Sequence, residues 1–151
     1  MRDALAAGRK IARIALAPCL NARGAMSGSI ICERAFEFAI RVVRLCDLLA
    51  ARGFGARHIA GQLIRCGTSI GANAEEAQEG QSKADYIAKM SISSKESRES
   101  RYWLRLAIAT GNVKKTEVEW ELREANEIRF MVRAAIRTAR SSPDRGHDRT
   151  D

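Results

Sequence analysis

The stretch IICERAFEFAIRVVRLCDLLAAR, at residues 30–52, decides the fold class. Its apolar residues recur at alternating steps of four and three, which places them on one face of an α-helix. They are Ile31, Ala35, Phe38, Val42, Leu45 and Leu49. Ala39, Val43 and Cys46 widen that face. We therefore expect this helix to pack against two neighbours.

The same periodicity predicts three more helices, over residues 56–79, 83–110 and 117–140. The connections between them are short, and no βαβ pattern occurs. We therefore predict an all-α fold, an antiparallel up-down-up-down four-helix bundle that occupies residues 29–140. No uncharged stretch approaches the roughly 20 residues that a membrane-spanning helix needs, so no membrane association is expected.

The net charge of +8 is spread unevenly along the 151 residues. Residues 1–28 carry +4, residues 29–140 carry +5, and residues 141–151 carry −1. The first segment is predicted to be a flexible basic extension and the last a disordered tail. A basic excess permits binding to nucleic acid or another polyanion without requiring it.

Two local patterns within the predicted helices are unusual. Gly67 and Gly71 lie four residues apart, which weakens helix propensity and indicates close approach to another helix. Residues 93–101, SSKESRESR, contain no apolar residue, so every face of the helix is polar there. Thr116 and Glu119 have the spacing of a capping box and predict the start of the last helix.

Two blocks of sequence resemble the bacterial four-helix-bundle protein family. They are SIGANAEEAQ at residues 69–78, and Asp85-Tyr86-Ile87 followed by KESRESRYWLRL at residues 95–106. The first members of that family are encoded in intervening sequences of large-subunit ribosomal RNA genes. The resemblance covers residues 33–140, and the family is related to the accessory protein of diversity-generating retroelements.

The resemblance implies several properties that the residues alone do not. It implies assembly into a closed homopentamer, and it implies that the protein is not an enzyme and uses no cofactor. The related accessory protein is a basic pentamer that binds a reverse transcriptase and nucleic acid. RNA or DNA and a reverse transcriptase are therefore the partners that the resemblance suggests.

Charged residues near the middle of the predicted bundle form a candidate structural polar network. Its members are Asn73, Glu96, Glu99, Arg129 and Arg133. Counting residues from the third turn places the two arginines beside the two glutamates, with Arg41, Arg44 and Arg65 at a similar height on the other helices. Carboxylates among arginines are expected to have lowered pKa values, which suits an ion-pair network better than general-base catalysis. Asn73 is expected to satisfy a buried hydrogen bond.

The last predicted helix carries a stripe of arginines at its C-terminal end. Arg129, Arg133, Arg137 and Arg140 are the candidate nucleic-acid contacts. The alternative is that they complement the helix dipole and form ion pairs, because the first half of the same helix is rich in glutamate. Tyr102 and Trp103 lie beside arginines and could stack on bases, but packing at a helix interface is the preferred interpretation.

The four cysteines have no metal-ligand spacing and no secretory signal is recognisable, so reduced thiols in the cytoplasm are expected. Together these observations favour a non-enzymatic oligomeric bundle that associates with nucleic acid. A protein–protein interaction scaffold with no nucleic-acid role is the alternative. A metal-dependent nuclease is disfavoured because the sequence has no cluster of metal ligands.

Overall fold

The computed structural model describes residues 27–142, and these residues form four long α-helices and one short 3₁₀ turn, with no strand among them. The elements are α2 (Ser27–Ala50), α3 (Phe54–Gln78), α4 (Lys83–Ala109), η1 (Lys115–Glu117) and α5 (Glu119–Ser141). The all-α prediction is confirmed for this part of the chain. The extension and tail predicted at the two ends lie almost wholly outside the described residues, although α2 begins two residues before the predicted bundle and α5 ends one residue after it.

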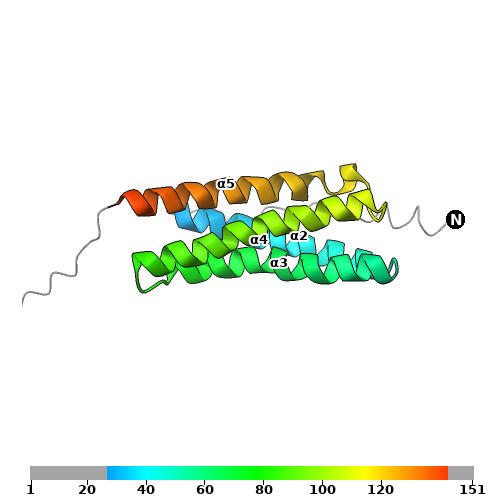
Figure 1. Ribbon diagram of the computed structural model, residues 1–151, viewed down its shortest axis with the longest axis horizontal. Coiled ribbons are helices and arrows are strands. Elements are labelled where there is room, and N and C mark those ends of the chain that lie inside the picture. The colour runs from blue at the N-terminus through cyan, green and yellow to red at the C-terminus, as the bar shows by residue number, and fades with distance from the viewer. Residues whose placement is uncertain (1–26, 143–151) are drawn as a thin grey trace, which may run out of the picture.

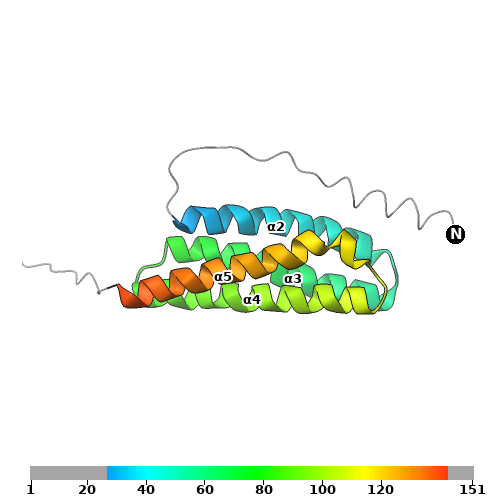
Figure 2. The same cartoon turned by 90° about the horizontal axis from the view of Figure 1, so that it is seen from above.

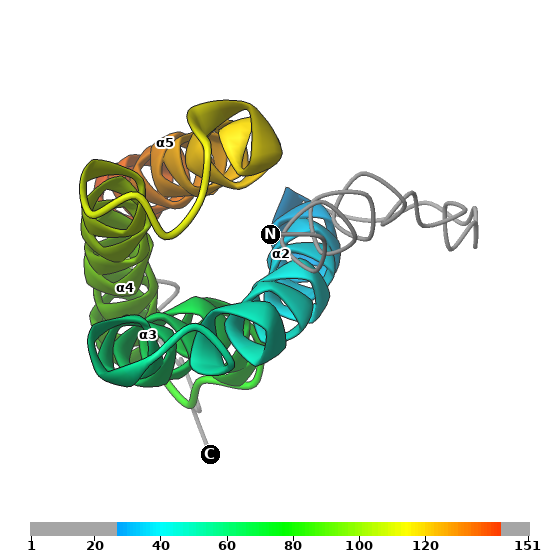
Figure 3. The ribbon, with the colours of Figure 1, turned by 90° about the vertical axis from the view of Figure 1, so that its right-hand side faces the viewer.

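The long helices lie lengthwise beside one another, which is consistent with a four-helix bundle (Figures 1 and 2). The view along the helices shows α3 between α2 and α4, and α5 on the far side of α4 (Figure 3). Helices that follow one another in the chain pack closely, and α2 and α5 make a smaller contact.

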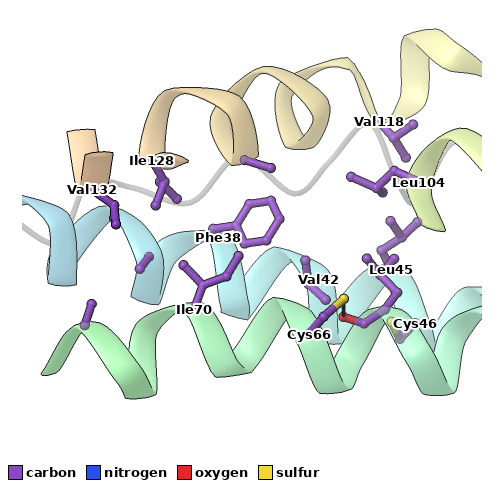
Figure 4. Close-up of a cluster of buried hydrophobic side chains, with 14 of the residues drawn as sticks. Phe38, Val42, Leu45, Cys46, Cys66, Ile70, Leu104, Val118, Ile128 and Val132 are labelled. Atoms are coloured by element: carbon purple, nitrogen blue, oxygen red, sulfur yellow. Dashed lines mark hydrogen bonds between the residues drawn. The ribbon is translucent and has the colours of Figure 1, made fainter. Parts of the chain in front are cut away.

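The core lies where the apolar faces of the four long helices meet (Figure 4). All six apolar residues of the stripe predicted within residues 30–52 are buried, and Phe38 and Val42 are wholly inaccessible. The other helices contribute fully buried aliphatic side chains such as Ile70, Leu104 and Ile128. The helical periodicity therefore identified the core-facing side of α2.

The predicted close approach at the glycines of α3 is confirmed at Gly67. A Cβ atom at Gly67 would lie 2.8 Å from Cγ1 of Val42 on α2, closer than two carbon atoms pack. A Cβ atom at Gly71 would be 3.6 Å from Ala35, an ordinary contact. The missing side chain at Gly67 thus allows α2 and α3 to pack against each other.

One side of the polar segment of α4 is buried in the folded protein. Ser93, Ser97 and Ser100 are completely buried and face the core. Ser93 Oγ donates to the Ile70 carbonyl at 3.0 Å, and Ser97 Oγ donates to the Ser93 carbonyl at 2.9 Å. Because backbone carbonyls accept from the hydroxyl groups, serine serves here as a small core residue.

The predicted capping box at Thr116 and Glu119 is wrong. The chain makes the 3₁₀ turn η1 at this point, and the carboxylate of Glu117 accepts from the Lys114 backbone N–H at 2.7 Å. Val118 then precedes α5 without a side-chain cap. The Glu117 carboxylate therefore satisfies a backbone donor one turn before the helix begins.

Candidate nucleic-acid interface

Two arginine–glutamate pairs join α2 to α5. Arg34 holds Glu124 through two bonds, Nε–Oε1 at 2.6 Å and Nη2–Oε2 at 2.7 Å. Arg41 Nε lies 2.8 Å from Oε1 of Glu121. The Cζ atom of Arg41 also lies 4.2 Å from the centroid of the Trp120 ring, so the guanidinium sits over that ring. Both glutamates are buried. These two acidic residues of α5 are therefore neutralised by α2.

The predicted pairing of Glu96 and Glu99 with Arg129 and Arg133 is wrong. Both carboxylates face Arg65 of α3: Glu99 Oε1 accepts from its Nη2, and Glu96 Oε2 lies 3.8 Å from its Nη1. The residue count had placed several arginines at the right height, but it could not tell which neighbouring helix the glutamates face. The buried serines turn this side of α4 toward α3 instead of α5.

The pKa of Glu96 also departs from the expected direction. Partial burial raises it above its ordinary value, and the neighbouring Glu99 carboxylate raises it further, while Arg65 opposes both effects. Desolvation therefore outweighs the ion pair, because the Arg65 side chain is more than half exposed and its guanidinium lies 3.8 Å from the Glu96 carboxylate.

Asn73 takes no part in a network with these charges. Its side-chain nitrogen donates to the Ser69 carbonyl at 2.9 Å and to Ser69 Oγ at 3.0 Å, both within α3. The side chain is half-buried. The expected hydrogen bond is thus present, but it is local to one helical turn.

The arginine stripe of α5 is accessible. Arg133, Arg137 and Arg140 are exposed and Arg129 is half-buried. Within residues 27–142, no hydrogen bond or ion pair involves the guanidinium group of any of the four. The ion pairs expected from the dipole interpretation are therefore not formed by this stripe, although the dipole itself favours cations at the end of α5.

A hydrogen bond between α4 and α5 fixes the direction of the stripe. Arg101 Nη1 donates to Asn126 Oδ1 at 3.0 Å. The four stripe arginines follow Asn126 by 3, 7, 11 and 14 residues, which are spacings that keep a side chain on the same flank of a helix. The stripe therefore lies along the side of α5 that adjoins α4.

Helix α4 adds further arginines to this side. Arg98 and Arg105 lie three residues before and four residues after Arg101, so all three share the flank of α4 that adjoins α5. Both are exposed. We call the combined surface the α4–α5 basic face. It consists of Arg98, Arg101, Arg105, Arg129, Arg133, Arg137 and Arg140. Sequence reasoning considered Arg101 and Arg105 only as neighbours of Tyr102 and Trp103 and did not consider Arg98, although the spacing of three and four residues was a sufficient signal.

The acidic residues that form ion pairs in the described part of the chain do so away from this face; they are Glu76, Glu96, Glu99, Glu121 and Glu124. The ion pairs among the described residues join α2 to α5 or α3 to α4, and none crosses from α4 to α5. Arg133 and Arg137 line an open hollow of about 550 Å³ together with the exposed ring of Phe130. The α4–α5 basic face thus carries arginines that no ion pair within residues 27–142 neutralises, and such charges suit phosphate groups.

The described residues contain neither a helix suited to crossing a membrane nor a cluster of metal ligands. No helix there is long and apolar enough to cross a membrane. No group of three or more His, Cys, Asp or Glu side chains is placed to hold a metal ion there either.

Comparisons with known proteins place these features in a context. The family model described as 23S rRNA-intervening sequence protein matches residues 28–134. A solved structure from Bacteroides thetaiotaomicron, a protein of unknown function from the S23 ribosomal protein family, is 35% identical. The match covers 74% of this chain and 99% of that chain, with a TM-score of 0.70. No curated protein matches the chain.

Proposed function

Because the chain belongs to the family described as 23S rRNA-intervening sequence protein, we propose that it is a non-enzymatic, oligomeric four-helix bundle that binds RNA or DNA through its α4–α5 basic face. The contacts are arginine–phosphate pairs, so binding is tolerant of sequence. The four α5 arginines predicted from the sequence are the centre of this surface, and the α4 arginines extend it.

One observation carries the proposal: the arginines of the α5 stripe have no acidic partner within the described part of the chain. Like charges crowded on one surface repel one another and destabilise a fold, and a bound polyanion relieves that repulsion. Arg34 and Arg41 behave differently, because both are committed to carboxylates. The charge pattern therefore distinguishes structural arginines from available ones.

We further infer an antiparallel up-down-up-down arrangement and assembly into a homopentamer. Short connections such as 51–53 and 79–82 support the first inference. The exposed apolar side chains of Phe36 and Val43 on α2 support the second, since subunit contacts cover such side chains. In a ring, five weak basic faces act together and raise the apparent affinity. Light scattering should give about five times the 16.7 kDa chain mass, and a stable monomer would exclude the pentamer.

Three further elements complete the proposal. The protein acts in the cytoplasm, in keeping with the free thiols of Cys32, Cys46 and Cys66. It acts through binding, without a catalytic reaction or a cofactor. Its protein partner, by the resemblance to the retroelement accessory protein, is a reverse transcriptase. A pure interaction scaffold remains the alternative, and it predicts no affinity for oligonucleotides.

The test is a titration of labelled single- and double-stranded oligonucleotides, read by fluorescence anisotropy, between about 50 and 200 mM salt. The wild-type affinity should fall steeply over this range. Arg133→Gln with Arg137→Gln should weaken binding and flatten the dependence on salt. Arg44→Gln with Arg57→Gln is the matched control, since it removes two exposed arginines from α2 and α3. Equal effects of the two double variants would contradict binding at the α4–α5 basic face, and no binding at 50 mM salt would favour the scaffold.

A further inference from the structure

A second hollow lies where the end of α4 meets η1 and the first turns of α5. Its volume is about 690 Å³. Its polar lining includes Arg101, Tyr102, Arg105 and Lys115, and its apolar lining includes Ile108 and Leu122. The hollow therefore combines three cations and an aromatic ring with an apolar lining, at the end of the α4–α5 basic face away from Arg140.

Tyr102 does not have the position expected of a packing residue. Its side chain is 56% exposed, whereas its neighbour Trp103 packs against the core. The centroids of the two rings lie 5.1 Å apart in a T-shaped arrangement, which covers at most one face of the tyrosine ring. The interpretation of both aromatics as interface residues thus holds for Trp103 and is wrong for Tyr102.

Trp103 gives the tyrosine a fixed support. Its ring nitrogen donates a hydrogen bond to Glu99 Oε1 at 3.2 Å. Its ring also forms a T-shaped contact with the His58 ring, with the two ring centroids 5.9 Å apart. A ring held in this way loses little conformational freedom when a second flat group stacks on it. Arg101 is held likewise by Asn126. One side of the hollow is therefore ordered before any ligand arrives.

The cations at the rim are available to a ligand. Arg105 and Lys115 are exposed, and within residues 27–142 neither side chain has a hydrogen bond or an ion pair. A base stacked in the hollow would bring its own phosphates to the rim. An unpaired nucleotide offers both groups at once, a flat ring and an adjacent anion.

We propose that this hollow binds one unpaired base of single-stranded RNA or DNA, stacked on Tyr102, with the flanking phosphates on Arg105 and Lys115. The inference rests on the proposed function, which brings nucleic acid to the α4–α5 basic face. It adds a preference for single strands, because the bases of a duplex are paired and stacked and cannot enter the hollow. Every base has a flat face, so the site accepts any sequence.

The test uses the full chain and a single-stranded oligonucleotide that contains 2-aminopurine, whose fluorescence falls when the base stacks. Tyr102→Ala should abolish the quenching and lower single-strand affinity about tenfold, with duplex affinity changed less than about twofold. Tyr102→Phe keeps the ring and should bind like the wild type. Phe54→Ala, which removes another exposed ring at the start of α3, should have no effect.

The rim is tested separately. Arg105→Gln and Lys115→Gln should each reduce the slope of log affinity against log salt by about 0.7 for single strands. Unchanged quenching and affinity in Tyr102→Ala would overturn this inference alone, provided that Arg133→Gln with Arg137→Gln still weakens binding. Failure of the wild type to bind any oligonucleotide at 50 mM salt would overturn the proposed function as well.

Discussion

Arg101 of α4 meets Asn126 of α5 across a 3.0 Å hydrogen bond, with an amide oxygen in the place where a carboxylate would neutralise the guanidinium. On the other side of α5 the same kind of contact is charged, since Arg34 meets Glu124. The contact between α4 and α5 is thus held together without cancelling the positive charge of its arginines. This difference distinguishes a surface that can bind anions from one that has only a structural role.

Asn126→Asp should therefore neutralise part of the α4–α5 basic face. The new carboxylate would pair with Arg101, so nucleic-acid affinity should fall several-fold and the free energy of unfolding should rise by up to about 1 kcal/mol. Anisotropy titrations and chemical denaturation measure the two effects. Gln62→Glu makes the same change in net charge on α3 and should leave the affinity unchanged, whereas an equal loss in both variants would contradict the argument.

Gly67 and Gly61 should respond to alanine in opposite directions. A Cβ atom at Gly67 would meet Val42 at 2.8 Å, so overpacking should outweigh the gain in helix propensity and cost about 1 kcal/mol net. At Gly61 a Cβ atom meets nothing within 4 Å, and Gly61→Ala should stabilise the fold by about 1 kcal/mol. Denaturant unfolding measures both. Equal stabilisation at both positions would show that α2 and α3 do not pack closely there.

Glu96 should make stability depend on pH in the direction opposite to an ordinary ion-paired carboxylate. Its pKa is raised in the folded state, so the folded protein holds this proton more tightly than the unfolded chain. The resulting stability is present at acid pH and is lost as the pH rises through the folded-state pKa. The Glu96→Gln variant has no carboxyl group to ionise, so it does not lose this stability as the pH rises. The free energy of unfolding of the variant minus that of the wild type should therefore be larger at pH 7 than at pH 4. Thermal unfolding across this range checks the sign, and the reverse trend would mean that Arg65 dominates.

Glu124→Ala should cost about 2 kcal/mol of stability, because it removes two charge-assisted hydrogen bonds and leaves the partly buried Arg34 side chain without its carboxylate. Glu127→Ala removes an exposed carboxylate from the same helix and should change stability by less than about 0.5 kcal/mol. Urea denaturation distinguishes the two. A loss below about 0.5 kcal/mol at Glu124 would show that the contact between α2 and α5 is held by apolar packing alone.

The sequence predicted the helices well because burial imposes a period on the chain. The α2 stripe was identified residue by residue, and the helix boundaries differ from the predicted ones by three residues or fewer. The errors arose where small polar residues replaced apolar ones. Ser93, Ser97 and Ser100 occupy core positions, but a pattern of apolar residues cannot identify them because their hydroxyl groups satisfy backbone carbonyls inside the helices.

The candidate site was predicted in part. The arginine stripe of α5 was recognised from its spacing. On α4, Arg101 and Arg105 were considered only beside two aromatic residues for which packing was preferred, and Arg98 was not considered. Counting residues gives the height of a side chain along the bundle but not the direction in which it points. Only the packed structure shows that the glutamates turn toward Arg65, which leaves Arg98 and Arg105 without a carboxylate partner among the described residues.

Photo-crosslinking tests most directly whether nucleic acid lies on the α4–α5 basic face. The full chain is irradiated with a single-stranded RNA that contains 4-thiouridine, and the modified peptides are identified by mass spectrometry. The account predicts adducts within residues 98–105 and 115–140, which Arg133→Gln with Arg137→Gln reduces and Arg44→Gln with Arg57→Gln does not. Adducts confined to other parts of the chain, or adducts that the first double variant leaves unchanged, would contradict it.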